Sequence, residues 1–237
     1  MTPAEPTPAE PVSAPSTPLT VRRRTTGTPK PAVITGVRLI GSGLARTVLR
    51  LRVDGAHHVP AQGPVLLAGN HSGILDGPLV FFLCPRRATM LTKSEVFVGI
   101  WARFCGWLAL IPVHRGQPDR AALKAGLDVL AAGGALAVFP EGTRGKGSFE
   151  SVADGLAYLA LRSGAPVVPI AVHGTAAALP KGRVFPSWRA PVRIVYGPPI
   201  QLDPVGDPRA RSTVRAAAEQ LRLALVDHLQ CTTEQPA

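Results

Sequence analysis

Short apolar runs alternate along the chain with longer amphipathic stretches, and segments that contain Gly or Pro separate them. The apolar runs predict buried strands, because Val, Ile, Leu and Ala fill them without leaving a polar face. They comprise residues 65–70, 135–142, 165–174 and 190–200. The longer stretches have the period of a helix, and the clearest are residues 118–134, 151–164 and 211–230. This alternation is typical of an α/β fold, with a mostly parallel central sheet flanked by helices.

The pattern of residues 31–52 predicts a basic amphipathic helix ahead of this alternation. Its apolar side chains share one stripe, made by Val33, Val37, Ile40, Leu44, Val48 and Leu51. The arginines lie away from the centre of that stripe, at Arg38, Arg46 and Arg50. Basic amphipathic helices often lie on anionic membranes, so membrane contact is one interpretation. A surface helix packed against its own domain is the other.

The middle of the chain holds two further apolar stretches. Residues 77–84 read as a buried helix or a buried strand. Residues 96–113 carry a single charge and approach the length of a membrane-spanning helix, but glycines and a proline interrupt them. We therefore expect a helix to about residue 107 and then a strand. The aromatic residues of that helix, Trp101, Phe104 and Trp107, suit an interfacial anchor, an acyl-chain wall or an ordinary core.

Composition separates one folded domain from the two ends of the chain. The 237 residues are 46% apolar, which is enough for one large domain with its own core. Pro, Ala, Thr and Glu dominate the beginning of the chain, so we expect a disordered Pro-rich tail over residues 1–30. The main domain is predicted to span residues 53–230, and residues 231–237 are predicted to be a disordered C-terminus.

The charge balance points to an anionic partner. The formal net charge is +11, and residues 21–52 contain eight basic residues and no acid. Aromatic residues make up only 5%, and the sequence has no recognisable nucleic-acid-binding motif. An anionic membrane surface is therefore favoured over nucleic acid.

The cysteines favour a cytosolic protein without a metal. Cys84, Cys105 and Cys231 form no CxxC pair and lack metal-ligand spacing, which is typical of reduced, mostly buried thiols. The Pro-rich beginning of the chain lacks the apolar core of a secretory signal. We expect neither a metal nor a bound cofactor.

The first candidate site is GNHSGILDGP, residues 69–78, which follows a predicted strand. His71 would lie in the turn and Asp76 in the first turn of the next helix, so one ring nitrogen of His71 can meet the Asp76 carboxylate. Gly73 would give the turn its freedom, and Ser72 is a candidate helix cap. A His held by a carboxylate is a general base with a fixed tautomer, whose other nitrogen can take a proton from a hydroxyl.

The second candidate site is VFPEGTRGKG, residues 138–147, which also follows a predicted strand. Its polar residues are Glu141, Gly142, Thr143 and Arg144. An Arg beside Thr and Gly in a loop suits phosphate, because a guanidinium fork matches phosphate oxygens. A solvated polar turn is the alternative. Arg115 follows another predicted strand and can point at the same anionic ligand, whereas His114 is a weaker candidate.

Taken in order, four segments resemble the sequence blocks of the glycerolipid acyltransferases, the family of the 1-acylglycerol-3-phosphate acyltransferases. The segments are NHSGILD, GWLALIPVHR, FPEGTRG and GAPVVPIAV, and the resemblance covers roughly residues 50 to 200. The motifs H-x4-D and F-P-E-G-T-R together are highly specific for this family, whereas either motif alone is less specific. The resemblance implies an α/β sheet domain, often with an N-terminal amphipathic helical element on the membrane.

The resemblance also implies roles for particular residues. His71 would deprotonate the acceptor hydroxyl and Asp76 would orient it, and the hydroxyl would attack the thioester directly, without an acyl-enzyme. The residues implied in holding the acceptor's phosphate are Arg115, Glu141, Gly142, Thr143 and Arg144. Those implied in shaping the acyl-donor site are Val168, Pro169 and Ile170. Glu150 stands where the family often has a Lys, which leaves the identity of the acceptor open.

The sequence thus predicts a peripheral membrane acyltransferase of phospholipid biosynthesis, on the cytoplasmic face of the cell membrane. It would move a fatty acyl group from acyl-CoA or acyl carrier protein to the free hydroxyl of 1-acyl-glycerol-3-phosphate (lysophosphatidic acid), giving phosphatidic acid. One alternative is the same reaction on another lysophospholipid, an amino-lipid or a glycolipid. From a different class, the alternative is a non-catalytic lipid-binding protein that keeps the fold. A basic nucleic-acid-binding protein is a third and weaker alternative.

Overall fold

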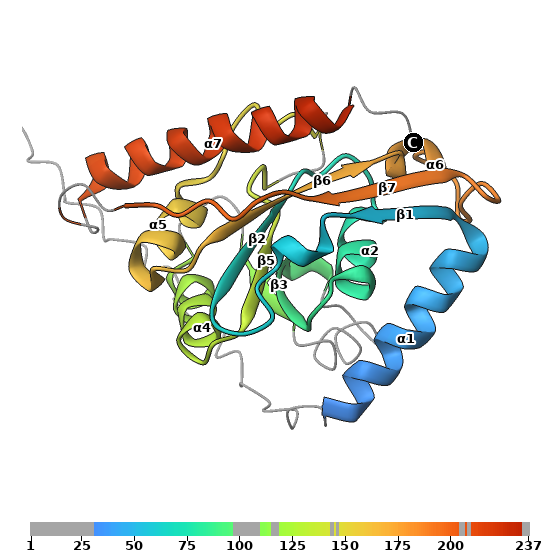
Figure 1. Ribbon diagram of the computed structural model, residues 1–237, viewed down its shortest axis with the longest axis horizontal. Helices are drawn as coiled ribbons and strands as arrows, with labels where there is room; N and C mark the ends of the chain where they lie inside the picture. Colours follow the sequence, from blue (N-terminus) through green and yellow to red (C-terminus); the bar gives the residue numbers. More distant parts are fainter. Residues whose placement is uncertain are drawn as a thin grey trace, which may run out of the picture.

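The computed structural model of the chain describes residues 31–96, 110–114, 119–142, 145, 147–203, 207 and 210–233. These residues contain a seven-stranded sheet with the order β1-β7-β6-β2-β5-β3-β4 (Figure 1). Its strands are β1 (Arg50–Asp54), β2 (Val65–Gly69), β3 (Ala88–Lys93), β4 (Leu110–Val113), β5 (Ala135–Val138), β6 (Val167–His173) and β7 (Pro191–Tyr196). The predicted α/β class and mostly parallel sheet are confirmed.

The directions of the strands bring distant parts of the chain to one edge of the sheet. Strands β2 to β6 all run the same way, because each pairs in parallel with its neighbours in that group. Strand β7 pairs antiparallel with β6 and parallel with β1. The beginnings of β1 and β7 therefore lie at the edge where β2 to β6 end. We call this the carboxyl edge, and α/β folds commonly place their sites there.

Helices cover both faces of the sheet, which gives three layers (Figure 1). On one face lie α1 (Pro31–Val48) and α2 (Asp76–Leu83), and on the other lie α4 (Arg120–Ala131), α5 (Asp154–Ser163) and α7 (Arg211–Thr233). Each face of the sheet has its own hydrophobic core, and successive residues of β2 point into opposite cores. Leu67 packs in the core beneath α2, whereas Leu66 packs in the core beneath α5 and α7. The short elements are α6 (Thr175–Ala178) and the 3-10 turns η1 (Ala56–His58) and η2 (Ser94–Val96).

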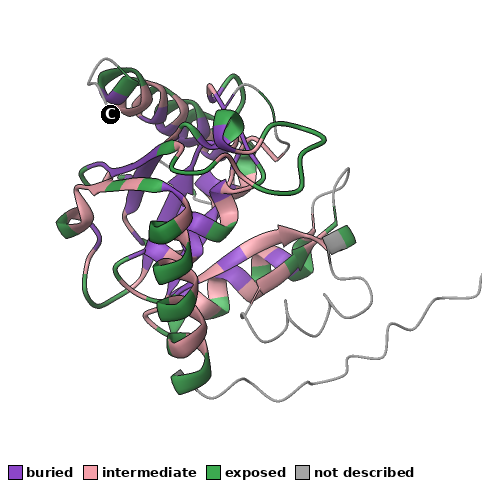
Figure 2. Cartoon of the chain, turned by 90° about the vertical axis from the view of Figure 1, so that its right-hand side faces the viewer, coloured by how far each residue is buried: buried purple, intermediate pink, exposed green. Residues whose placement is uncertain are grey.

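Helix α1 differs from its prediction in extent and in the direction of its apolar stripe. It ends at Val48 rather than at residue 52, and the residues from Arg50 form strand β1. The predicted stripe is divided: Val37 and Val48 pack against the core, whereas Ile40 and Leu44 are 75% and 64% exposed. Figure 2 shows exposed residues recurring along the helix. Both interpretations of this helix therefore keep support, since one side is packed and another displays apolar side chains.

Close contact with α2 explains why α1 packs against the domain. A Cβ on Gly41 would lie 2.5 Å from the Phe82 ring, so a glycine is needed where the two helices approach. Arg38 donates from Nε to the Phe81 carbonyl at 3.1 Å, and its Nη2 donates to the Cys84 carbonyl. This arginine thus satisfies carbonyl groups at the end of α2, which would otherwise lack partners. It is directed toward the protein, not toward a membrane.

The remaining elements agree with the sequence pattern except in two places. Residues 77–84, left as a helix or a strand, lie largely within helix α2, and the strand expected before residue 113 is β4. Strand β3 was not predicted, because its sequence ATMLTK mixes apolar and polar residues and contains no continuous apolar run. Helix α7 continues to Thr233, past the predicted start of the C-terminal tail. The tail over residues 1–30 and the aromatic helix before residue 107 lie outside the described residues.

Candidate active site

The turn between β2 and α2 carries the His–Asp pair at the carboxyl edge. Strand β2 ends at Gly69 and α2 begins at Asp76, so His71 lies in the connecting turn, as the spacing predicts. The two side chains meet, with 2.9 Å between His71 Nδ1 and Asp76 Oδ2. The Asp76 side chain is fully buried and that of His71 is 17% exposed. The pair therefore presents the imidazole, and not the carboxylate, to the surroundings.

Two further donors fix the Asp76 carboxylate. The Gly73 N–H donates to Oδ2 at 2.7 Å, and the Thr175 hydroxyl donates to Oδ1. Thr175 is itself fully buried, and its hydroxyl lies 3.2 Å from that of Ser72. Ser72 therefore contacts α6 and does not cap α2, whose N-cap position is occupied by Leu75. A carboxylate with both oxygens bonded has little freedom to turn away from the imidazole.

Gly73 serves the turn by its small size. Its φ is not among the positive values found at other glycines, so conformational freedom does not explain the residue. A Cβ at this position would lie 2.8 Å from the Thr175 hydroxyl oxygen and 2.9 Å from the Ala176 nitrogen. A side chain here would push α6 away from the turn. Gly73 thereby allows Thr175 to reach Asp76.

The imidazole of His71 is oriented for proton transfer. Because the Asp76 carboxylate only accepts, a neutral His71 imidazole in this contact carries its proton on Nδ1 and leaves the lone pair of Nε2 free. Within the described residues, no group hydrogen-bonds to Nε2. The ring stacks on Phe139, with 4.7 Å between centroids and 29° between planes. The geometry provides a general base for a hydroxyl that reaches Nε2.

The loop after β5 braces the backbone of the same turn. Glu141 Oε1 accepts from the N–H groups of His71 and Phe149, each at 3.4 Å, and the Gly145 N–H donates to the His71 carbonyl at 3.1 Å. Burial raises the pKa of Glu141, and the two backbone N–H groups only partly offset this effect. Gly142 has a φ of 68°, which favours glycine at this position. Glu141 thus holds the two candidate loops together.

A buried amide secures the start of the turn to the neighbouring strand. Asn70 Nδ2 donates to the Val172 carbonyl at 3.1 Å, and the Val172 N–H donates to Asn70 Oδ1 at 2.7 Å. This pair of bonds continues the β2–β6 ladder by one side chain after β2 has ended. Asn70, Thr175 and Phe139 are site residues that the sequence reasoning did not single out. The sequence could have indicated Asn70 and Phe139, because they lie in the candidate segments GNHSGILDGP and VFPEGTRGKG, whereas Thr175 lies in neither.

Other predicted site residues fall in two groups. Arg115, Thr143 and Arg144 lie outside the described residues, so their phosphate contacts stay predictions. The second group, predicted to shape the acyl-donor site, consists of Val168, Pro169 and Ile170. They are buried in β6 beside the end of β2, where Pro169 pairs with Ala68 and Ile170 with Gly69. Their part in donor binding also stays a prediction.

A second His–Asp pair with the same spacing has a structural role. His114 Nδ1 lies 2.9 Å from Asp119 Oδ2, but the imidazole is largely exposed. Asp119 is the N-cap of α4 and accepts from the Ala122 N–H at 2.9 Å. Its pKa is lowered to about 2, chiefly because it also accepts from the His114 backbone N–H. This arrangement caps a helix and needs no catalytic role.

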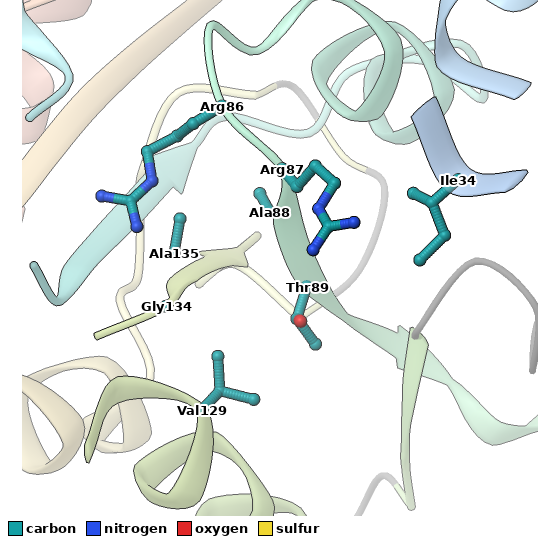
Figure 3. Close-up of a pocket in the computed structure, with 8 residues that line it drawn as sticks. All are labelled: Ile34, Arg86, Arg87, Ala88, Thr89, Val129, Gly134 and Ala135. Atoms are coloured by element: carbon teal, nitrogen blue, oxygen red, sulfur yellow. The ribbon is translucent and has the colours of Figure 1, made fainter. Parts of the chain in front are cut away.

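Two cavities lie at opposite edges of the sheet. The first, of about 450 Å³, is largely apolar and lies at the carboxyl edge between α4, α5 and the ends of β3 to β5. Phe139 lines it and also stacks on His71, so the cavity adjoins the candidate base. The second, of about 360 Å³, lies at the other edge and includes Arg86 and Arg87 (Figure 3). Arg86 there donates to the carbonyls of Pro60, Gly63 and Gly133, which is a structural role.

Sequence comparison relates the chain to proteins with a named activity. The 1-acyl-sn-glycerol-3-phosphate acyltransferase of Limnanthes alba is 32% identical over 163 residues, which cover 65% of this chain and 55% of that protein. The 1-acyl-sn-glycerol-3-phosphate acyltransferase alpha of Bos taurus is 32% identical over 164 residues, with the same coverage of 65% and 55%. The chain therefore spans about half the length of these relatives.

Structural and family comparisons agree with this relation. The crystal structure of the 1-acyl-sn-glycerophosphate (LPA) acyltransferase, PlsC, from Thermotoga maritima matches with a TM-score of 0.65 and 21% identity. The match covers 86% of this chain and 81% of that one, and at this identity it establishes the fold alone. The family described as Acyltransferase matches residues 50–173, just over half of the chain, and includes the His71–Asp76 turn and the loop with Glu141. The chain therefore belongs to the acyltransferase family.

Proposed function

We propose that this chain transfers a fatty acyl group from a thioester to the free hydroxyl of 1-acyl-glycerol-3-phosphate. The single observation that carries the proposal is the His71–Asp76 pair, whose free ring nitrogen suits deprotonation of a hydroxyl. The names of the relatives from Limnanthes alba and Bos taurus support the choice of acceptor. A non-catalytic lipid-binding protein would need neither the buried carboxylate nor the oriented imidazole.

The proposed reaction has one chemical transfer and no acyl-enzyme. Nε2 of His71 takes the proton of the acceptor hydroxyl as its oxygen attacks the thioester carbonyl carbon. A tetrahedral intermediate forms, the C–S bond breaks, and the C–O ester bond remains. The thiolate of acyl-CoA or acyl carrier protein leaves and recovers the proton from the imidazolium. The Asp76 carboxylate stabilises the imidazolium beside it.

We propose that the acceptor's phosphate is recognised by residues that follow β4 and β5 in the sequence. Arg115, Thr143 and Arg144 supply two guanidinium groups and a hydroxyl for the acceptor's phosphate. Glu141 and Gly142 directly precede Thr143 and Arg144 in the sequence, and Glu141 accepts from the His71 N–H, which ties this loop to the β2–α2 turn. Another lysophospholipid, an amino-lipid or a glycolipid is the alternative acceptor, because Glu150 stands where the family often has a Lys.

The apolar cavity beside Phe139 is proposed to hold the acyl chain of the donor. Its volume of about 450 Å³ and its apolar lining fit a chain of methylene groups, and it opens at the same edge as His71. A thioester whose chain lies there would bring its carbonyl carbon toward the imidazole. Val168, Pro169 and Ile170 of β6 are not among the residues that line this cavity, and Val168 and Ile170 pack in the core on the opposite face of the sheet.

Membrane contact is proposed for the outward side of α1. This side displays Val33, Leu39, Ile40 and Leu44. The net charge of +11 favours an anionic surface. No helix among the described residues is long and apolar enough to cross a bilayer. The proposed location is the cytoplasmic face of the cell membrane, with α1 lying in the interface.

A thioester-cleavage assay tests the function. The purified chain is incubated with acyl-CoA or acyl-acyl carrier protein, lysophosphatidic acid and a thiol reagent, beside His71→Ala and Asp76→Asn. We expect acceptor-dependent thiol release from the wild type and a loss of at least about 10³-fold in His71→Ala. If no thiol is released with any acceptor in a panel of lysolipids, amino-lipids and glycolipids, the proposed enzymatic activity is wrong. A much faster acceptor than lysophosphatidic acid would replace the proposed substrate and leave the mechanism intact.

A further inference from the structure

The connection between α6 and β7 displays large apolar side chains that no core covers. Val184 is 81% exposed, Phe185 78% and Trp188 70%. Single exposed apolar residues are ordinary on a protein surface, but three within five positions form a patch. We call residues 179–190 the β6–β7 loop.

The backbone of this loop is held in place, so the exposure is a feature of the fold. The Arg189 N–H donates to the Val48 carbonyl at 2.7 Å, and the Ser187 N–H donates to the Ala178 carbonyl at 2.8 Å. Arg189 adopts a φ of 56°, which is uncommon for a residue with a side chain. These bonds join the loop to the end of α1 and to α6. The apolar side chains remain on the outside of a fixed loop.

The loop lies at the carboxyl edge, beside the candidate active site and the end of α1. Figure 1 shows α6 and the connection to β7 at the same end of the sheet as the junction of α1 with β1. Helix α6 directly precedes the loop and supplies Thr175 to the Asp76 carboxylate. Ile74, in the turn between β2 and α2 that carries His71, is also exposed. Exposed apolar groups from two separate segments, the loop and the turn that carries His71, therefore lie at one edge of the molecule.

The positive charge around the apolar residues of the loop indicates which kind of partner surface the loop can bind. Lys181, Arg183 and Arg189 are exposed around the apolar residues, and no acid occurs between Asp154 and Asp203. Basic residues around an exposed Trp and Phe match a bilayer that contains anionic lipids. Trp in particular favours the level of the headgroups, because its ring is apolar and its N–H is polar.

We propose that the β6–β7 loop is a second membrane-docking element. Val184, Phe185 and Trp188 enter the boundary between headgroups and acyl chains, and Lys181, Arg183 and Arg189 meet the lipid phosphates. The inference rests on the membrane contact proposed for α1, and it adds a second, separate point of attachment. The loop and α1, as two separate points of attachment, fix the orientation of the domain, so that the β2–α2 turn with His71 faces the lipid surface.

Vesicle flotation with the full chain tests the loop. The variants are Phe185→Ser/Trp188→Ser in the loop, and Leu223→Ser, which removes an exposed apolar side chain from α7 on the other face. On vesicles of phosphatidylglycerol and phosphatidylcholine, we expect the loop variant to lose at least about tenfold in partition coefficient. Leu223→Ser should bind like the wild type. Equal binding of all three proteins would overturn the proposal.

Three additional measurements test the role of the loop. Trp188→Phe should lower the quenching of tryptophan emission by brominated lipids, and unchanged quenching would contradict insertion. Lys181→Gln/Arg183→Gln should weaken binding to the anionic vesicles and leave any binding to pure phosphatidylcholine unchanged. Sedimentation velocity without lipid identifies the other possible occupant, a second copy of the chain. Loop-dependent dimers, with flotation unaffected by the loop variant, would assign the patch to self-association and overturn the proposal.

Activity measurements separate this proposal from the proposed function. With short-chain, water-soluble donor and acceptor, Phe185→Ser/Trp188→Ser should retain the wild-type rate, whereas transfer to an acceptor embedded in vesicles should fall with binding. If the wild type transfers no acyl group in either format, the proposed function fails while the flotation result still decides the loop. If transfer to the embedded acceptor is unaffected by the loop variant, the docking role is wrong and the enzyme stands.

Discussion

At the scale of single residues, the candidate site depends on how Asp76 is held. Its carboxylate accepts from His71, Gly73 and Thr175, and the last of these lies 99 residues further along the chain. The His–Asp contact is local, whereas the bond from Thr175 requires that α6 pack on the turn. Thr175 touches no proposed substrate atom and is therefore a positioning residue.

Removing the Thr175 hydroxyl should weaken catalysis without weakening substrate binding. In Thr175→Val the Asp76 Oδ1 atom loses its donor, which costs about 1 to 2 kcal/mol. We expect kcat to fall by roughly 5- to 30-fold with KM nearly unchanged. Thr175→Ser keeps the hydroxyl and should retain most of the wild-type rate. The pH profile of kcat should shift in Thr175→Val but not in Thr175→Ser. A loss that is equal in both variants would point to packing instead.

Replacing Glu141 by Gln should stabilise the fold in a pH-dependent way. Burial raises the pKa of Glu141 in the folded state, so ionising this group costs stability once the pH exceeds its unfolded value of about 4.3. Glutamine keeps an oxygen that can accept from the backbone of His71 and Phe149. Urea unfolding should show the variant more stable than the wild type near pH 7, and the difference should vanish below about pH 4. A difference that does not change with pH would contradict this origin.

At the scale of elements, strand β1 determines where α1 ends. Arg193 of β7 is buried and donates to Asp54 Oδ2 at 2.7 Å, which joins the last residue of β1 to the middle of β7. Burial raises the pKa of Asp54, but its hydrogen bonds with Arg193 and Arg52 outweigh this effect and lower it. Breaking a buried pair leaves an uncompensated charge, so this contact holds the strand in register. The end of α1 is thereby fixed at the carboxyl edge.

Filling the cavity between α4 and α5 should change the preferred length of the acyl donor. Gly155 lines the cavity, and a Cβ there would lie 3.5 Å from Leu123 Cδ2, which is an ordinary contact. Gly155→Leu should lower kcat/KM for a sixteen-carbon donor by about tenfold relative to an eight-carbon donor, and Gly155→Ala should change it less. The check is kcat/KM over a series of acyl-CoA lengths. Equal losses at every length would exclude this cavity as the chain site.

At the scale of the whole molecule, apolar groups and positive charge coincide at the edge that carries the site. The C-terminal end of α1, the β2–α2 turn and the β6–β7 loop are far apart in sequence, yet the strand directions bring them to the carboxyl edge. An enzyme whose acceptor lies in a membrane needs this arrangement, because its base must reach a hydroxyl at the headgroup level. The proposed orientation and the proposed chemistry thus support one another.

Removing exposed apolar side chains from α1 should weaken membrane binding and leave the fold intact. Ile40→Ser/Leu44→Ser changes largely exposed residues, so the free energy of unfolding in urea should stay within about 0.5 kcal/mol of the wild type. Flotation with anionic vesicles should fall by about tenfold, and added salt should weaken what remains. Val37→Ser is the control, because Val37 packs on the core and its loss should instead destabilise the fold. Unchanged flotation in Ile40→Ser/Leu44→Ser would move the contact away from α1.

The sequence by itself determined the features that depend on neighbours in the chain. The alternation of strands and helices follows from local hydrophobic periods, and the His71–Asp76 contact follows because a strand ends just before one residue and a helix begins at the other. Only the tertiary structure decided the features that depend on packing between distant segments. The bond from Thr175 to Asp76, the stacking of Phe139 on His71 and the side of α1 that faces outward are of this kind. No local period encodes them, because each is set by strand order and direction, which place residues far apart in sequence side by side.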